Sequence, residues 1–515
     1  MQRFIARHRD HIKGVLNGFD RLLFRGTLLN LAHTSGFQLF LNVLGVLRKN
    51  CAVFFQQATE RLLEASLRVA KEQGRPILYL ASSRSDKEAE ARAIAKRDSI
   101  NEGLICVLTS VEPCASFQVY RNRETKRTEI RKHWTKCKHL YSYWIDPVFG
   151  FMHARLQTWF PFSMQIYING REWLSRQMSR AGIAYERRDN CFVGIQDLSR
   201  AQRLADAQRT VPWERLLGRI ARRAHPALSA ILHPFRSEYF WSLWQSEWAT
   251  DVMFDSQAAL ARIYRPLIHH GISSFSSADV MRFLGAKVNG NFAGEIVSDF
   301  KNRPEGVRIK HSVDHNSVKL YDKQGSVLRV ETTINDSAGI KVYRAKQGDP
   351  RGPKTWRPLR QGIADLPRRS KVSQACNERY LNALAVADTS ARLGPLLQEI
   401  VRPVCSNKTR VRGLRPWSPE DLALFTAVNR GEFCINGFRN RDLQGLLYSD
   451  PPQDKTERRQ RASRLTRLIR MLRAHALIRK QSGSHRYHVT PKGRELFTAI
   501  LAAQEITLAQ LKAAA

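Results

Sequence analysis

Acidic side chains are scarce in this chain of 515 residues. Asp and Glu number 46 against 84 Lys and Arg, so the formal net charge is +38. This imbalance excludes an ordinary charge-balanced surface, because so much positive charge repels itself unless a polyanion neutralises it. Arginine binds phosphate and guanine through paired hydrogen bonds. Nucleic acid is therefore the expected partner, and a ribosome-like scaffold or a membrane-surface protein is the alternative.

Cysteine is sparse as well, since the eight residues are scattered and no two form a CxxC pair. This excludes a disulfide framework and favours reduced thiols in a cytosol-like compartment. The longest apolar run, around residues 37–47, falls far short of the ~20 residues that span a bilayer. The N-terminus lacks the pattern of a signal peptide. We expect a soluble, cytoplasmic protein with no membrane partner.

The common catalytic motifs are missing too. The sequence has no GxxxxGKS/T, no strand-borne GxGxxG, no GxSxG and no HExxH. This argues against an ATPase, a Rossmann oxidoreductase, a serine hydrolase and a zinc protease of the usual kinds. His133, Cys137 and His139 lie close together, but their spacing fits a basic strand with a buried thiol better than a zinc site.

Apolar residues make up 43% of the chain, which is ample for buried cores. The length favours two to four domains. We expect an α+β multidomain fold in three parts. Residues 1–225 would form a mixed α/β sheet domain, residues 226–400 a helical region with a β-hairpin and a basic linker, and residues 401–515 a nucleic-acid-binding domain.

In the first part, short apolar runs at 76–80 and 104–110 flank a charged helix over 86–97, which predicts a β-α-β unit. A β-hairpin over 117–134 has an almost wholly charged tip. Such a tip is either a solvated turn or a finger lying along a phosphate backbone. Its candidate contacts are Arg121, Arg123, Lys126 and Arg127.

Residues 149–169 alternate between apolar and polar side chains, which predicts two strands with a shared polar face. A helix over 171–180 follows. The polar face is a nucleic-acid platform, an active face or an ordinary solvated surface.

In the central part, Trp241, Trp244 and Trp248 recur at helical spacing, so residues 239–254 are predicted to be a helix. Helices over 278–284 and 292–300, followed by a hairpin over 317–334, outline a possible second winged helix. Residues 345–374 are rich in Pro, Gly and basic residues and are expected to form a linker or an extended arm.

The last part is predicted to be helix, helix, long basic helix, hairpin and helix, with the turn of the hairpin at Ser482-Gly483. Together with the runs Leu477-Ile478-Arg479 and Thr490-Pro491-Lys492-Gly493, this order resembles bacterial winged helix-turn-helix regulators of the MarR and PadR kind. The resemblance implies that the third helix enters the major groove and that the wing contacts the backbone. A protein-binding or RNA-binding use of the same fold stays open. The implied contacts are Arg458, Arg461, Arg464, Arg467 and Arg470 on the helix, and His485 and Arg486 on the wing.

Residues 319–335, KLYDKQGSVLRVETTIN, weakly resemble the replication initiators of filamentous phages and rolling-circle plasmids. The resemblance implies a tyrosine that attacks a phosphodiester and a Mg²⁺ or Mn²⁺ ion held by His and acidic groups. The chain departs from that family in lacking a His-apolar-His pair, and the expected hairpin register sets two of the acidic candidates on opposite faces. The alternative is a plain hairpin with a Lys319–Glu331 ion pair. The implied residues are Tyr343 or Tyr321 as the nucleophile and Asp322, Glu331 and His315 as metal ligands.

Four further carboxylates, those of Asp20, Glu112, Asp146 and Asp189, lie near predicted strand ends. A nuclease of the two-metal type needs several carboxylates to converge. The sequence as a whole favours a nucleic-acid-binding protein, with DNA preferred over RNA, of a mobile element or a replication system. A metal-dependent strand-nicking or strand-transferring enzyme and an RNA-binding ribonucleoprotein component stay open, and Mg or Mn is the only cofactor that the enzyme would imply.

Overall fold

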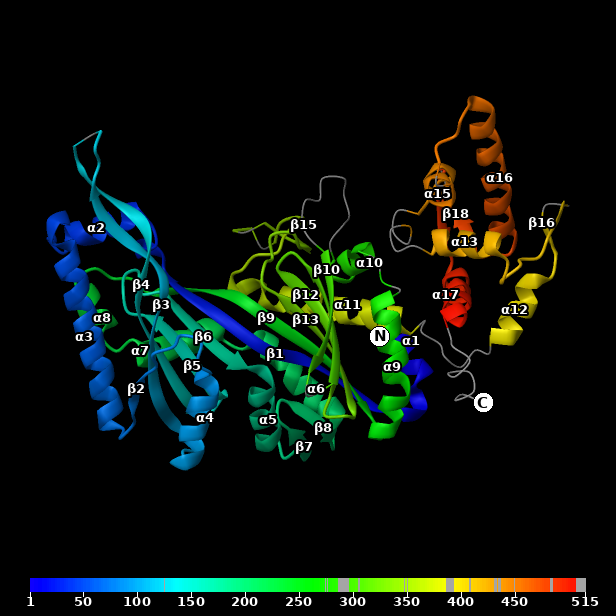
Figure 1. The fold of residues 1–515 in the computed structure, drawn as a ribbon. Coiled ribbons are helices and arrows are strands. Elements are labelled where there is room, and N and C mark those ends of the chain that lie inside the picture. The colour runs from blue at the N-terminus through cyan, green and yellow to red at the C-terminus, as the bar shows by residue number, and fades with distance from the viewer. Residues whose placement is uncertain are drawn as a thin grey trace. The chain divides into compact units, whose positions relative to one another are not determined.

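The computed structural model describes residues 1–505 except 125, 274, 276, 286–295, 304–305, 347, 350, 386–392, 407–408, 430–432, 434–436, 449 and 482–484. The fold is mixed α/β with a large mixed sheet (Figure 1). Across the described part of the chain, no helix combines the length and the apolar character needed to cross a membrane.

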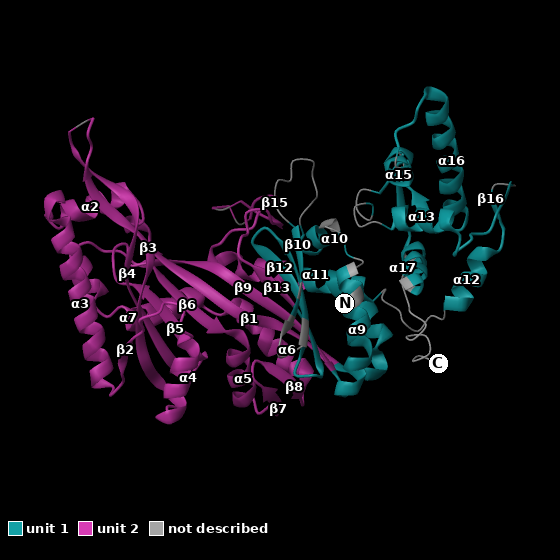
Figure 2. Ribbon diagram, in the orientation of Figure 1, with its two compact units in different colours: residues 1–13, 254–330, 375–515 teal, residues 14–253, 331–374 magenta. Residues whose placement is uncertain are grey.

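The chain divides into two compact units, each assembled from separate segments. Residues 1–13, 254–330 and 375–515 form unit 1, and residues 14–253 and 331–374 form unit 2 (Figure 2). Each unit therefore draws on more than one of the three parts predicted from the sequence.

Unit 2 is built on strands in the order β13-β9-β1-β6-β5-β4-β3-β2. β2 and β3 run parallel, while β3, β4, β5, β6 and β1 pair antiparallel in succession. The parallel pair is joined by α4, so the predicted β-α-β unit is confirmed. The bounds are β1 Ile12–Leu28, β2 Ile77–Tyr79, α4 Lys87–Arg97, β3 Gly103–Arg121, β4 Thr128–Asp146, β5 Gly150–Gln157, β6 Met164–Asn169, β9 Tyr239–Phe254 and β13 Val327–Ile334.

Helices supply the rest of the core of unit 2. Phe24 of β1 packs against Trp213 of α7 with ring centroids 5.1 Å apart, and Phe55 of α3 packs against Phe160 at 5.1 Å. On β5 and β6 the apolar positions are buried, and His153, Arg155, Gln165 and Tyr167 are partly exposed, as the alternation predicts. The remaining elements are α2 Thr34–Val43, α3 Cys51–Glu72, α5 Gly170–Arg180, β7 Tyr185–Arg188, β8 Cys191–Ile195, α6 Leu198–Ala207, α7 Trp213–Ala224 and α8 Leu228–Leu232.

The prediction of a helix over residues 239–254 is wrong, because this segment is strand β9. Its first residues alternate with a period of two, with Trp241 and Leu243 buried and Phe240 and Trp244 exposed. Gly26 of β1 leaves the space that the Trp241 ring fills, since a Cβ there would lie 2.7 Å from it. Further along, β9 is buried at every position. A strand buried on both faces shows no alternation, so its aromatic run imitates a buried helix.

The prediction of a linker over residues 345–374 is also wrong in part. Strand β15 (Thr355–Pro358) pairs with β14 (Lys341–Arg344), and helix α11 begins at Leu366 and ends at Leu384. Arg369 of α11 is 1% exposed. Its guanidinium donates to the carbonyl oxygens of Leu243 at 2.8 Å and Ile334 at 2.6 Å. A buried cation is tolerated where acceptors satisfy it, so basic composition alone does not indicate a solvated segment.

Unit 1 holds β10, β11, β12 and the first part of β13, up to Val330, in the order β10-β11-β12-β13, with α1, α9, α10 and the second part of α11. The hairpin of β12 and β13 agrees with the prediction. The predicted helix over 292–300 is wrong for residues 296–300, which belong to β10, and residues 292–295 and the preceding turn lie outside the described residues. The possible second winged helix therefore loses the helix on which it depended. The bounds are α1 Gln2–Arg7, α9 Gln257–Ser273, α10 Ser277–Phe283, β10 Ile296–Arg303, β11 Gly306–Val313 and β12 Asn316–Lys323.

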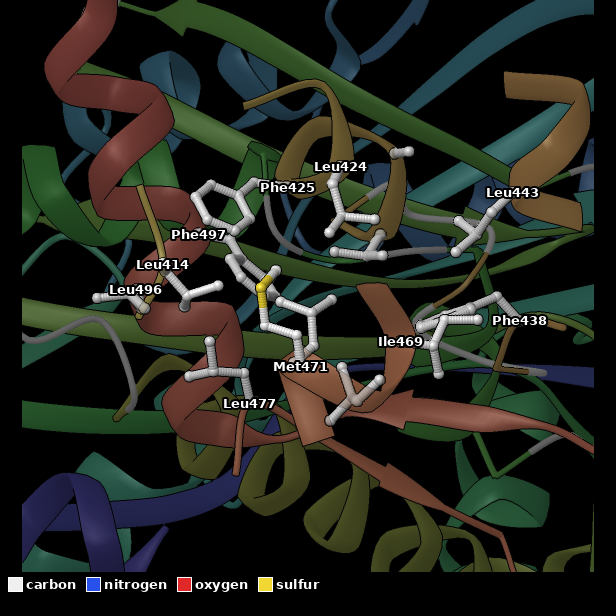
Figure 3. Packing of buried hydrophobic residues seen from close by; sticks show 14 of the residues in the cluster. Leu414, Leu424, Phe425, Phe438, Leu443, Ile469, Met471, Leu477, Leu496 and Phe497 are labelled. Atoms are coloured by element: carbon white, nitrogen blue, oxygen red, sulfur yellow. The ribbon is translucent and has the colours of Figure 1, made fainter. Parts of the chain in front are cut away.

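The C-terminal part of unit 1 has a hydrophobic core of its own, which includes Leu424, Ile469, Met471 and Phe497 (Figure 3). Ser418 caps helix α13 (Pro419–Val428) by accepting a hydrogen bond from the Asp421 backbone N–H. The order of elements is the predicted one, and the predicted turn at 482–483 lies outside the described residues. The bounds are α12 Leu393–Val401, β16 Val404–Ser406, β17 Thr409–Val411, α13 Pro419–Val428, α15 Asn440–Leu447, α16 Lys455–Ala474, β18 Ile478–Lys480, β19 Tyr487–Val489 and α17 Pro491–Glu505.

Candidate metal site and basic surfaces

Three carboxylates converge within unit 2, one from each of three neighbouring strands. Asp20 lies on β1, Glu247 on β9 and Glu331 on β13, and the strand order is β13-β9-β1. One ligand oxygen of each lies within 4.8 Å of the others. The three residues are 8%, 6% and 2% exposed, respectively. Adjacent strands are about 4.8 Å apart, so one carboxylate at the same level of each strand brings the oxygen atoms together.

Such an arrangement is costly unless positive charge compensates it, from a bound metal ion or from neighbouring side chains. Carboxylates this close repel one another, and burial disfavours the charge of each. Oxygen ligands of a single Mg²⁺ lie about 2.1 Å from the ion and so at most about 4.2 Å from each other. Small side-chain movements would therefore let all three oxygen atoms reach one ion. The donor set, which consists of carboxylates, fits Mg²⁺ or Mn²⁺.

Arg21 lies beside the acidic group and is half exposed. Its Nε is 3.6 Å from a carboxylate oxygen of Glu247, and its side chain is 45% exposed. Its guanidinium also lies over the Tyr167 ring, 5.4 Å from the centroid. Burial alone would lower the pKa of Arg21, but Glu247, Tyr167 and Asp20 raise it by more. The pKa of Arg21 therefore lies above its usual value. Arg21 is thus a fixed cation at the boundary between the carboxylates and solvent.

Asp20 is held in place by two neighbours. Asn190 donates a hydrogen bond from Nδ2 to the Asp20 carboxylate at 2.8 Å. Arg171 is fully buried, with its Nε 3.9 Å from Asp20 and its Nη2 3.0 Å from Asp251. Gly170 allows this approach, because a Cβ there would lie 2.1 Å from the Phe19 carbonyl oxygen. The first turn of α5 can therefore reach the acidic group.

Of the other carboxylates near predicted strand ends, Glu112 and Asp146 have structural partners, and Asp189 is exposed in the turn between β7 and β8. Glu112 accepts hydrogen bonds from Ser110 at 2.7 Å and Arg155 at 2.8 Å. Burial raises its pKa, but these hydrogen bonds and that of Tyr141 outweigh it and hold the pKa at about 2. Asp146 accepts from the backbone N–H of Val148 at 2.9 Å. Of the four carboxylates, Asp20 is the one that joins the acidic group formed by described residues.

The candidates from residues 315–343 are distributed differently. Glu331 belongs to the acidic group, whose other members are Asp20 and Glu247. Asp322 is half-buried on β12 in unit 1, where burial raises its pKa, and His315 is exposed in the β11–β12 turn. Tyr321 is half-buried opposite Arg308 of β11. Tyr343 is exposed on β14.

The predicted basic finger is the tip of the β3–β4 hairpin. Arg121, Arg123, Lys126 and Arg127 are all exposed there, and the tip projects at the upper left of Figure 1. Residue 125 lies outside the described residues. Trp134, further down β4, is 73% exposed. Cations and an exposed ring thus occupy one arm of unit 2.

The arginines of α16 differ in their surroundings. The side chain of Arg461 is only 16% exposed. It donates to Glu457 at 2.5 Å, and its guanidinium lies 4.7 Å from the centroid of the Tyr448 ring. Arg464 pairs with Glu420 at 2.8 Å, and Arg470 donates to Thr409 at 3.1 Å. Arg458, Arg464, Arg467 and Arg470 are exposed, and so is His485, while Arg486 is half-buried. Arg461 therefore stabilises its own helix, and the others leave a cationic face.

No family model, no curated protein and no solved structure matches the chain. What the chain does must therefore be inferred from its own acidic group and basic surfaces.

Proposed function

We propose that the chain is a metal-dependent enzyme that cleaves or transfers phosphodiester bonds in nucleic acid, with DNA as the favoured substrate. The observation that carries the proposal is the convergence of Asp20, Glu247 and Glu331 in a chain whose net charge is +38. Three buried carboxylates that converge can hold a divalent cation between them, and the basic surface fits a polyanionic substrate. A mobile element or a replication system would use such an enzyme.

The residues have distinct tasks in this proposal. A Mg²⁺ or Mn²⁺ ion on the three carboxylates would polarise the scissile phosphate and stabilise the charge that develops there. Arg21 would pair with a phosphate oxygen, because it is exposed on one side and held by Glu247 on the other. Asn190 and Arg171 are positioning residues, since they orient Asp20.

The C-terminal part of unit 1 would read the substrate. We assign α13, α15 and α16 with the β18–β19 hairpin to a winged helix, on the order of these elements and on their separate core. The exposed face of α16, with Arg458, Arg464, Arg467 and Arg470, would lie in or along the major groove. His485 and Arg486 would contact the backbone from the wing. The β3–β4 finger would add phosphate contacts that do not depend on sequence.

The test is a cleavage assay. The purified chain is incubated with end-labelled single-stranded DNA, duplex DNA and RNA in Mg²⁺, Mn²⁺ or EDTA, and the products are separated on denaturing gels. We expect a shortened strand, or label bound covalently to the protein if a tyrosine such as Tyr343 or Tyr321 is the nucleophile. Product should be absent in EDTA, in Glu247→Gln and in Glu331→Gln.

The matched control is Glu64→Gln, which removes an exposed carboxylate on α3. It should cleave like the natural chain. Intact nucleic acid under every condition, with retention on native gels, would contradict the enzyme and leave a non-catalytic binding protein. Cleavage of RNA alone would move the substrate to RNA.

A further inference from the structure

The β14–β15 hairpin presents two large aromatic side chains to solvent. Tyr343 is 58% exposed and Trp356 is 69% exposed. They are direct cross-strand partners, and their ring centroids are 5.8 Å apart at an interplanar angle of 58°. Exposing so much aromatic surface forgoes the stabilisation that burial provides. The metal chemistry proposed above gives Trp356 no task, and it gives the ring of Tyr343 none.

The pair is held on a fixed support. Along β14, Val342 and Arg344 are buried while Lys341 and Tyr343 are exposed. Val342 packs in a small core with Ile334, Ile340 and Leu359. Arg344 is tied to the hairpin by hydrogen bonds to the carbonyl oxygens of Ala345 at 3.2 Å and Pro358 at 3.1 Å. The buried face of the hairpin is therefore anchored, and the opposite face displays the two rings.

The charge around the rings identifies their partner. Residues 341–360 contain seven basic residues and one acidic residue. Among the basic ones, Lys341, Lys346, Arg351 and Lys354 are exposed. A neutral or basic protein surface that covered the rings would bring these cations close to it without neutralising them. A polyanion with flat apolar groups can stack on the rings and neutralise the cations.

We propose that Tyr343 and Trp356 form a stacking site for unpaired nucleotides, with the cations of the hairpin holding the sugar-phosphate backbone. Proteins that bind single strands combine these two features, because every base has a π-face that an aromatic ring can cover. Paired bases inside a duplex present only their edges, so the site selects single-stranded or melted substrate. The inference rests on the proposed nucleic-acid substrate and specifies its form.

This assignment gives Tyr343 a role through its ring, whereas the nucleophile suggested by the sequence would act through its hydroxyl. Tyr343→Phe separates the two, because it keeps the ring and removes the hydroxyl. Stacking predicts that Tyr343→Phe binds single strands as the natural chain does and that Tyr343→Ala does not. A covalent adduct that is lost in Tyr343→Phe would overturn the assignment.

The binding test compares bases with phosphates. Fluorescence anisotropy in EDTA measures the affinity of the full chain for a short labelled thymidine oligonucleotide and for an abasic strand of equal length. We expect the natural chain to prefer the strand with bases. Trp356→Ala should bind that strand about 5- to 150-fold more weakly, the range that one base–aromatic stack provides, and should bind the abasic strand unchanged. Trp356→Phe should restore most of the preference.

Tyr79→Ala is the control, because Tyr79 is equally exposed, at 61%, on β2 of the same unit. It should leave the preference for bases intact. Equal binding of the two strands by the natural chain would overturn the stacking site while leaving the proposed function standing. Binding of neither strand, nor of duplex DNA or RNA, would instead overturn the proposed nucleic-acid substrate.

Discussion

Arg21 of β1 and Glu247 of β9 lie 3.6 Å apart on neighbouring strands, and they differ sharply in exposure, with side-chain values of 45% and 8%. The pair therefore joins the buried carboxylates to the solvent side of the site. In the proposed enzyme, a substrate phosphate that approaches the carboxylates would meet the Arg21 guanidinium first. This geometry distinguishes Arg21 from the many surface arginines, whose loss would weaken binding in general.

Arg21→Ala should slow cleavage at saturating substrate about 100- to 1,000-fold, the range for removing one preorganised charge stabiliser. Arg21→Lys keeps the charge but loses the paired hydrogen-bond geometry, so it should restore only part of the rate. Single-turnover rates in Mg²⁺ are the measurement. Arg25→Ala is the control, since Arg25 lies on the same strand but stacks on Trp244 at 4.8 Å. Equal losses in the two alanine variants would show that Arg21 has no special role.

A bound divalent ion should stabilise the folded chain. The melting temperature should rise when Mg²⁺ or Mn²⁺ replaces EDTA, because a ligand that binds only the folded state adds its binding free energy to stability. The rise should be a few °C for about 1–2 kcal/mol of added stability. It should vanish in Glu331→Gln and in Asp20→Asn and persist in Glu64→Gln. A rise of the same size in all four proteins would place the ion elsewhere.

The location of this group shows what the sequence can and cannot predict. Elements with a local signal are predicted well: the β2-α4-β3 unit, the β12–β13 hairpin and the long basic helix α16 all follow from local sequence patterns. Asp20 is a candidate because it lies near a predicted strand end, and Glu331 is one because of the resemblance to replication initiators. Their meeting depends on the order β13-β9-β1, which no local pattern encodes.

Glu247 escaped prediction for a related reason. It lies on β9, where burial on both faces erases the alternation that identifies a strand. If residues 239–254 had been predicted to form a strand, Glu247 would have been recognised as an acidic residue in the middle of a sheet. Arg369 shows the converse error, since it lies in the segment predicted to be a basic linker and is buried against oxygen acceptors. Arg171 is also buried against an acceptor, and its local sequence does not indicate this. Burial of a charged group is a property of the assembled fold.

The basic finger should contribute phosphate contacts rather than sequence recognition. Replacing both Arg123 and Lys126 with alanine should reduce the slope of log K against log salt by about 2 on duplex DNA, because each phosphate contact releases about one counterion. Affinities for different sequences should fall by the same factor. Anisotropy titrations over a series of salt concentrations give the slope. An unchanged slope, equal to that of an exposed control on α3 such as Arg61→Ala, would show that the finger does not contact the backbone.

Acid stability should report on His225, which is 1% exposed in the core of unit 2. Burial lowers the pKa of His225 to about 3. The folded state therefore keeps this imidazole neutral, while the unfolded chain protonates it below its ordinary pKa of 6.5. Between these two values the unfolded state binds more protons, so stability falls as the pH falls. His225→Phe removes this dependence and keeps a ring against Phe162, whose centroid lies 4.9 Å from that of His225. Tyr239, whose hydroxyl lies 3.2 Å from Nδ1 of His225, retains its hydrogen bond to the Phe162 carbonyl oxygen.

Denaturant unfolding from pH 7 to pH 4 should show a shallower loss of stability in His225→Phe than in the natural chain. His133→Phe, at an exposed position of β4, should follow the natural profile. Parallel profiles for all three proteins would mean that His225 is hydrated or protonated in the folded state.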